Sequence, residues 1–155
     1  MTWGDLERAD PDLAAAGASR LHGRVAYLAT VSPDGTPRVH PVTPVVGDGR
    51  LFVFMEPTSP KGADLRRGSR YGLHSAVADS SGRDGEFLTR GTGALVGDPA
   101  VRAAAEHHAT YPPAAHYVLF ELAVEAAMLT GYVDGRPVRR RYPLTGTVEN
   151  RQPPT

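Results

Sequence analysis

Lys61 is the only lysine in the chain, and its surroundings predict an anion-binding site. The remaining sixteen Lys or Arg positions all hold arginine, so composition alone does not account for a lysine here. Lys61 follows Ser59 and Pro60, a pair typical of a helix N-cap and the first helical position. Unpaired backbone amides at a helix start favour an anion, and the ammonium adds a full charge. This spacing therefore predicts a seat for a phosphate group.

Hydroxyls and a second cation could complete this site. Thr58 and Ser59 each offer a hydroxyl near Lys61, and Arg38 lies in an earlier, extended segment. A flat aromatic heterocycle with a phosphate tail would suit a groove beside these groups. The residues that could line the groove are His40 to Val42, through their amides, and Phe54 and Met55. The alternative is that Ser59 is only a cap, Lys61 is solvated and the two strand residues belong to the core.

The elements that must position these residues are mostly short strands. Apolar, β-prone runs separated by turns predict strands at 24–31, 37–46, 50–55, 71–77, 86–96, 116–125 and 126–133. Cap and proline signals predict helices at 10–21, 61–70 and 100–110. The first three strands should form an antiparallel meander, with the second at an edge or opposite a ligand because Pro41 and Pro44 lack ladder donors. Gly91 and Gly93 indicate a bulge or a close backbone approach.

Short strands joined by hairpin turns, with a few small helices, predict a mainly β fold. We expect a six- to seven-stranded antiparallel split β-barrel, because closing a sheet removes its exposed edges. The length of 155 residues fits a single domain over residues 1–155. Within it we expect an N-terminal helical segment at 1–22 and a C-terminal, Arg-containing tail at 136–155.

Charge and composition exclude several classes of partner and chemistry. Lys and Arg together number 17, as do Asp and Glu, so no global basic field favours nucleic acid. The chain has no cysteine, which removes disulfides, thiolate nucleophiles and cysteine-ligated metals. No apolar run reaches the roughly 20 residues of a membrane span, and the acidic N-terminus is unlike a signal peptide. We therefore expect a cytoplasmic protein that binds neither nucleic acid nor membrane.

Four stretches of the chain carry a spacing more specific than any single motif. They are Gly35 to Val42, Phe52 to Met55, Ser59 to Arg67 and Tyr71 to Ser75. Together they resemble the pyridoxamine 5'-phosphate oxidase-like FMN-binding split-barrel superfamily, over roughly Arg24 to Val96. The resemblance implies a six-stranded split barrel, a homodimer, and FMN held in a groove at the dimer interface.

The resemblance also implies roles for individual positions. Arg38 and Lys61 would grip the FMN phosphate, and Glu86 would reach in from the other chain. The positions that would lie along the flavin ring, through backbone or side chain, are Val39, His40, Pro41, Val42, Phe54 and Met55. The Thr58 and Ser59 hydroxyls remain candidate phosphate ligands from the local pattern.

The chain departs from relatives that oxidise pyridoxamine phosphate at three places. Pro60 precedes the lysine where those relatives have a basic residue, and Glu86 stands where they have glutamine. Their C-terminal segment holds the substrate with Arg and His, whereas this chain offers Arg139 to Tyr142 without histidine. These departures argue against that particular activity.

The expected function is FMN binding with transfer of hydride or electrons to or from a small organic substrate. No catalytic acid–base pair is evident, which a flavoenzyme tolerates because its cofactor carries the chemistry. One alternative is a reductase dependent on the deazaflavin F420, with Arg66, Arg67 and Arg70 meeting its polyglutamyl tail. Another is a non-catalytic protein that binds flavin or haem.

The histidines add one open question and one exclusion. His40 could contact the flavin or a substrate, or be a half-buried strand residue, and His74 is expected to pack against the sheet. Glu106, His107 and His108 have metal-ligand types, but neighbouring residues on a helix point apart. We therefore expect no metal site there.

Overall fold

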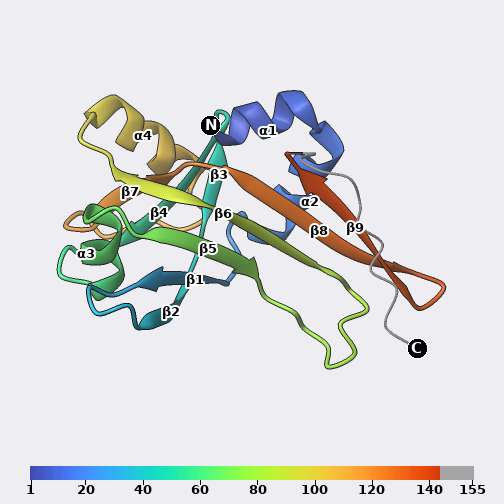
Figure 1. The fold of residues 1–155 in the computed structure, drawn as a ribbon. Helices are drawn as coiled ribbons and strands as arrows, with labels where there is room; N and C mark the ends of the chain where they lie inside the picture. The colour runs from blue at the N-terminus through green and yellow to red at the C-terminus, as the bar shows by residue number, and fades with distance from the viewer. Residues whose placement is uncertain (144–155) are drawn as a thin grey trace.

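The computed structural model describes residues 1–143 as a curled antiparallel sheet flanked by short helices (Figure 1). Its strands are β1 (Ala26–Val31), β2 (Pro37–Val42), β3 (Val45–Gly47), β4 (Arg50–Met55), β5 (Arg70–Ser75), β6 (Glu86–Leu95), β7 (Val118–Leu122), β8 (Ala126–Val133) and β9 (Arg136–Tyr142). Its helices are α1 (Trp3–Ala9), α2 (Pro11–Leu21), α3 (Pro60–Arg66) and α4 (Pro99–His108). The predicted fold class, a mainly β antiparallel split barrel, is confirmed.

The strand β6 joins the two halves of the sheet. Its first half pairs with β5 and β8, and its last three residues pair with β7. Between these halves, a Cβ added to Gly91 would stand 1.9 Å from the carbonyl oxygen of Ala123. Only glycine fits at this distance, so the predicted close backbone approach is confirmed.

The strand β2 lies at an edge of the sheet, as predicted. The strand order is β2-β1-β5-β6-β7-β4-β3, and β8 and β9 extend from the first half of β6. An edge suits Pro37 and Pro41 because neither can donate a ladder hydrogen bond. Arg38 pairs with Thr30 of β1, and Thr30 is buried. The alternation of β2 therefore turns Arg38 to the inner face of the sheet and its neighbours to the outer face.

Capping residues define the helices. Asp10 caps α2 by accepting the Leu13 amide, and Asp98 caps α4, each with proline at the first helical position. Both helices were predicted within one or two residues. The helix α1 lies within the expected N-terminal helical segment at 1–22 but was not predicted as a separate helix, although Thr2 and Asp5 form a reciprocal capping box at its start.

The predicted three-stranded meander is confirmed in its two antiparallel pairings, because residues 37–42 pair with β1 and residues 45–47 pair with β4, but its second strand is not continuous. The segment 37–46 forms two strands, β2 and β3, interrupted at Thr43 and Pro44. The strand β4 pairs with β3 and β7, not with β2. Local turn signals predicted that each strand pairs with the next, but the β4–β7 pairing is set by burial of β4 on both faces, which no turn records.

Two further boundaries need correction. The predicted helix at 61–70 ends at Arg66, and Arg70 already begins β5. The predicted tail at 136–155 begins with strand β9, which pairs with β8 through a turn at Asp134 and Gly135, both with positive φ. This Asp-Gly turn is a hairpin signal in the sequence. With β3 and β9, residues 1–143 contain nine strands where six or seven were expected; residues 144–155 of the predicted tail lie outside the described residues.

The main core lies between the sheet and the N-terminal helices. Trp3 and Leu13 are fully buried, and the Trp3 ring lies 6.0 Å from that of Phe87 on β6. Figure 1 shows α1 and α2 beside β8, and α3 and α4 at the other side of the molecule. A second, smaller cluster under α4 contains Phe52 and Phe54. No helix in residues 1–143 is long and apolar enough to cross a membrane.

Candidate functional site

The helix α3 forms as its sequence predicts and seats itself tightly on the sheet. Ser59 is the N-cap and accepts the Gly62 amide at 3.3 Å, and Pro60 follows at the first helical position. A Cβ at Gly62 would meet the sulfur of Met55 at 3.2 Å, so glycine allows the helix to lie close to β4. On the buried side of the helix, Asp64 and Leu65 are both almost completely covered.

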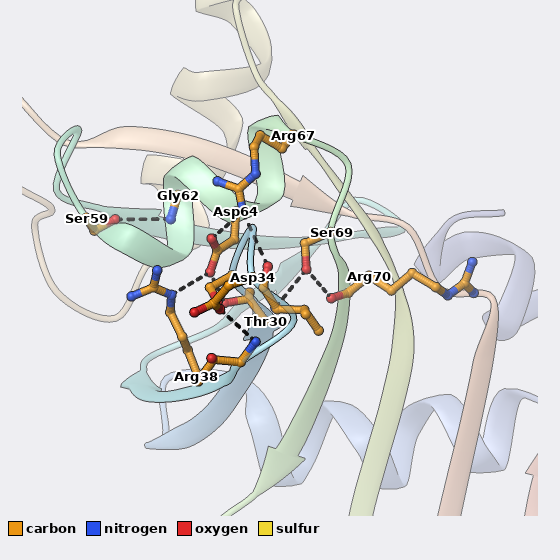
Figure 2. Close-up of polar contacts among 12 residues, drawn as sticks. Thr30, Asp34, Arg38, Ser59, Gly62, Asp64, Arg67, Ser69 and Arg70 are labelled. Atoms are coloured by element: carbon orange, nitrogen blue, oxygen red, sulfur yellow. Dashed lines mark hydrogen bonds and ion pairs between the residues drawn. The ribbon is translucent and has the colours of Figure 1, made fainter.

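Asp64 is a fully buried carboxylate that collects polar groups from three elements (Figure 2). Its Oδ2 accepts a hydrogen bond from Thr30 Oγ1 of β1 at 2.8 Å. Its Oδ1 accepts one from Arg67 Nη2, just beyond α3, at 2.7 Å. The Nε atom of Arg38, on β2, lies 3.1 Å from Oδ2 as an ion pair. Asp64 thus ties β1, β2 and α3 together at one end of the sheet.

The charge on Asp64 is stabilised despite its burial. Burial alone would raise the pKa of this carboxyl, because removal from water disfavours the anion. Hydrogen bonds from Arg67 and Thr30, and the charges of Arg38 and Arg67, outweigh that effect and hold the pKa below its usual value. Asp64 is therefore ionised at neutral pH.

The cations predicted to hold a phosphate lie near the same end of β2. Lys61 lies three residues before Asp64 on α3, and the residue is half-buried. Burial lowers the pKa of Lys61, so the free protein holds this charge at some cost. Burial, and then the charges of Lys61 and Arg38, lower the pKa of His40 against the opposing charge of Asp64. The structure therefore brings Arg38, His40 and Lys61 within electrostatic reach of one another.

Two buried nitrogen atoms at this site lack a hydrogen-bond partner. They are Nδ1 of His40 and Nε of Arg38, whose contact with Asp64 is close but poorly directed for a hydrogen bond. Lys61 makes no ion pair within residues 1–143. Buried polar groups without partners are uncommon and point to a missing hydrogen-bond partner. For Nδ1 of His40, a ligand could supply an acceptor or a donor according to the tautomer of the ring.

The other predicted flavin contacts divide between three environments. Val39 and Pro41 face outward from β2, and Val39 is 64% exposed. Val42 is buried in the main core. Phe54 and Met55 point to opposite faces of β4: Met55 lies under α3, whereas Phe54 lies in the smaller cluster under α4. In one chain, the side chains of Val39, Val42 and Phe54 therefore do not join the Arg38–Lys61 group.

The hydroxyls of Thr58 and Ser59 and the carboxylate of Glu86 differ in whether they are free to contact a ligand. Thr58 is exposed, whereas the Ser59 hydroxyl is buried and already accepts the Gly62 amide. Because α3 has only seven residues and its cap is made, the cations are the stronger argument for an anion site than the helix end. Glu86 begins β6 and lies 3.5 Å from Nε2 of His74, with both side chains partly exposed.

The three arginines considered for a polyglutamyl tail all have partners within the chain. Arg66 donates to the carbonyl of Pro57, Arg67 donates to Asp64, and Arg70 pairs with Glu125. Among the metal-ligand types on α4, Nε2 of His108 lies 3.0 Å from Asp48. Within residues 1–143, no group of three such residues is placed to hold a metal ion.

Sequence reasoning missed Thr30 and Asp64. Asp64 stands three residues after Lys61 in a predicted helix, so the two share a helix face, and this spacing could have marked it. Thr30 carried no comparable signal, because only the register of β1 against β2 brings it opposite Arg38.

Two concave regions of the surface lie away from this group. One, of about 310 Å³, is lined by residues of β6, β8 and β9, including Arg90 and Arg141. The other, of about 560 Å³, lies near the end of α2 and includes Arg20 and Arg24. Arg38, His40 and Lys61 line neither of them.

Comparison with known proteins identifies the family. The family model described as pyridoxamine 5'-phosphate oxidase matches residues 18–131, well over half of the chain. A search of curated proteins by sequence gives no significant match.

Solved structures share the fold. A heme binding protein from Mycobacterium smegmatis is 20% identical, with 81% of this chain and 57% of that protein covered and a TM-score of 0.59. PhzG from Burkholderia lata 383, in complex with tetrahydrophenazine-1-carboxylic acid, is 16% identical over 88% of this chain and 85% of that chain, with a TM-score of 0.60. An F420 reductase is 23% identical over 71% of this chain and 94% of that chain, with a TM-score of 0.54. This chain therefore spans little more than half the length of the heme binding protein. The match of the family model over residues 18–131 shows that this chain belongs to the pyridoxamine 5'-phosphate oxidase family.

Proposed function

We propose that the protein binds FMN and uses it to transfer hydride or electrons to or from a small organic substrate. The observation that carries this proposal is that Arg38 and Lys61 both lie within electrostatic range of His40, while Arg38 approaches Asp64 through Nε. A phosphate group would supply acceptors for the remaining donors of Arg38 and Lys61. Arginine and lysine are the side chains that proteins most use to bind phosphate.

The residues present fit the phosphate end of FMN in charge as well as in type. Arg38, Lys61 and Arg67 carry three positive charges, and Asp64 removes one, which leaves two. A phosphate monoester carries about −1.5 to −2 charges at pH 7. Arg38 and Lys61 would hold this group, and the exposed hydroxyl of Thr58 is the remaining candidate donor. The backbone of residues 39–42, at the sheet edge, would border the ring.

When bound, FMN would supply the redox chemistry, while the chain would supply position and electrostatics. Lys61 and Arg38 would neutralise the phosphate and fix the cofactor at one end. Neutral His40, favoured by its lowered pKa, would be free to accept or donate one hydrogen bond at the site. The departures at Pro60 and Glu86 keep us from assigning pyridoxamine phosphate as the substrate. We expect the protein to be located in the cytoplasm, because a chain without cysteine suits a reducing compartment.

A homodimer is part of this proposal. The outer face of β1 and β2 carries Tyr27, Val31 and Val39, which are 45%, 44% and 64% exposed. The β1–β2 register places Pro37 and Pro41 on the same face, so an apolar strip lies open beside the site. Glu86 and His74 continue this face on β6 and β5. A second chain covering it would bury the strip and could bring Glu86 to the partner's flavin.

The proposed dimer interface is tested by introducing a charge on this face. Wild-type protein should elute from gel filtration at twice the 16.5 kDa chain mass. Val39→Arg should shift it to the monomer, because two like charges would meet in an apolar interface. Val138→Arg is the matched control, since Val138 is 53% exposed but lies on β9. A wild-type monomer, or an equal effect of both variants, would contradict the proposed interface.

The proposed cofactor is tested by identifying the small molecule that the protein carries. Mass spectrometry of the small molecule released on denaturation should give FMN, and apo-protein should bind added FMN. Steady-state assays with NADH or NADPH and a dye acceptor then ask whether bound flavin turns over. A protein that carries no FMN and does not bind it would contradict the proposal, and bound flavin without turnover would support a binding protein.

A second candidate is a haem-binding protein, which one observation favours. His40 has a lowered pKa and an unpartnered Nδ1, and neutral imidazole nitrogen is a common iron ligand. The nearby cations could then meet haem carboxylates. Titration with haem beside FMN, and His40→Ala, separate the candidates: the substitution should abolish haem binding but weaken FMN binding only slightly. F420 receives less support, because Arg66, Arg67 and Arg70 already have partners.

A further inference from the structure

We propose that Asp64 is a positioning residue, which orients Arg38 for a phosphate ligand at the α3 end of the sheet. The inference rests on the proposed function only in taking FMN as the ligand that presents this phosphate. Asp64 is fully buried, and its side-chain partners are Thr30, Arg38 and Arg67. It acts on Arg38, and through Arg38 on the ligand.

The contacts of Asp64 leave it one orientation. The side chain is 1% exposed, and both carboxylate oxygens have partners, Thr30 and Arg38 on Oδ2 and Arg67 on Oδ1. A buried carboxylate held by several donors can turn only by breaking them. Asp64 is therefore a fixed anchor for a long arginine side chain that is 36% exposed and would otherwise sample several rotamers.

The atom by which Arg38 is held leaves its binding end free. Arg38 approaches Asp64 through Nε, and within residues 1–143 it donates no hydrogen bond. Figure 2 shows the two terminal nitrogens of Arg38 pointing away from Asp64, on the side where Ser59 lies. Terminal guanidinium nitrogens form the paired donors that bind phosphate in a bidentate manner. Asp64 thus fixes the stem of the guanidinium without occupying its fork.

Positioning and simple charge predict opposite results when Asp64 loses its charge. Asp64→Asn keeps the size of the side chain and raises the local positive charge by one. Coulomb's law alone then predicts tighter binding of a phosphate. Positioning predicts weaker binding, because the neutral amide no longer anchors Arg38.

The test compares FMN with riboflavin, which lacks the phosphate, by fluorescence titration of apo-protein. Asp64→Asn should weaken FMN binding about tenfold, because a poorly oriented Arg38 would lose a charged hydrogen bond to the phosphate. Riboflavin binding should stay unchanged. Glu125→Gln is the matched control, because it neutralises the Arg70–Glu125 ion pair away from the site. In an Arg38→Ala background, Asp64→Asn should cost no further FMN affinity.

Several outcomes would overturn the positioning role. They are unchanged or tighter FMN binding by Asp64→Asn, an equal loss for FMN and riboflavin, and an undiminished loss in the Arg38→Ala background. If Asp64→Asn does not fold, Thr30→Val takes its place. That variant keeps the carboxylate and the buried volume but removes one anchor, so a smaller loss for FMN alone is expected, and no loss would contradict the proposal.

Inorganic phosphate separates this inference from the proposed cofactor. Phosphate binding to apo-protein, followed by ³¹P NMR line broadening, needs no flavin groove. If wild-type protein binds phosphate but not FMN, the cofactor proposal fails, and Asp64→Asn must still weaken phosphate binding for the positioning role to stand. If wild-type protein binds neither, both proposals are overturned.

Discussion

Two regions of the molecule are rich in arginine, and they use it differently. The α3 cluster consists of Thr30, Arg38, Lys61, Asp64 and Arg67; Thr30, Arg38 and Arg67 contact the buried Asp64 carboxylate, and Lys61 lies one turn before it on α3. The β9 arginines are Arg136, Arg139, Arg140 and Arg141, and all four are exposed. Among the β9 arginines, Arg140 pairs with Asp10 and Asp12 at the end of α2.

The two regions differ in burial and in partners rather than in the number of cations, and this difference makes only the α3 cluster a candidate binding site. The β9 strand carries more cations than the α3 cluster, but water solvates them and screens their charges. In the α3 cluster, Lys61 is partly desolvated, and Nε of Arg38 makes no hydrogen bond.

Removal of the central carboxylate should destabilise the protein, whereas removal of an exposed one should not. Asp64→Ala leaves Arg38 and Arg67 without their anion. Breaking a buried ion pair costs about 3–5 kcal/mol, and the partial exposure of both arginines reduces the expected loss to about 2–3 kcal/mol. Asp12→Ala is the control, because Asp12 is 84% exposed and pairs with Arg140 at 3.7 Å. Urea unfolding at pH 7 measures both, and equal losses would contradict the distinction.

Lys61→Ala should weaken FMN binding far more than a substitution among the β9 arginines. Loss of one charged hydrogen bond corresponds to about 1.5–3 kcal/mol, or roughly ten- to a hundredfold in affinity. Arg139→Ala removes an exposed cation of the same sign and should leave the affinity unchanged. Fluorescence titration with FMN measures both. A comparable loss in Arg139→Ala would show that overall charge, not the α3 cluster, binds the phosphate.

The pH dependence of FMN affinity should report Lys61. Burial lowers the pKa of Lys61 in the free protein, and a bound phosphate would raise it again by favouring the charged form. The affinity for FMN should therefore be highest below the pKa of Lys61 in the free protein, and it should fall as the pH rises above that pKa. Lys61→Arg should move this fall to higher pH, because arginine keeps its charge. Titrations across the alkaline range test this, and an unmoved profile would exclude Lys61 as its source.

Sequence reasoning succeeded where the signals are local. Asp10-Pro11 and Asp98-Pro99 marked the starts of α2 and α4, and prolines in the second strand marked a sheet edge. The same local reading brought Arg38 and Lys61 forward as a pair, and both lie within electrostatic range of His40.

It failed where long-range packing decides. The pairing of β4 with β7 joins segments more than 60 residues apart, and no turn between them records it. Asp64 was not singled out in the sequence, and only the assembled sheet brings Thr30 and Arg38 to it. Whether a charge is buried depends on the assembled fold, so the centre of the α3 cluster lay beyond local patterns.

The smallest effect is expected at the best-paired of the β9 arginines. Arg140 is 50% exposed, and its hydrogen bond to Asp10 is the first cause that lowers the pKa of Asp10. Arg140→Ala should therefore cost little stability in urea unfolding at pH 7. A carboxyl with a lowered folded-state pKa contributes stability above its unfolded pKa and loses it as the pH falls through the folded one. The difference between wild type and Arg140→Ala should thus disappear as the pH falls below the folded-state pKa of Asp10, while FMN affinity stays unchanged. A loss of FMN affinity in this variant would make β9 part of the binding site and remove the contrast between the two regions.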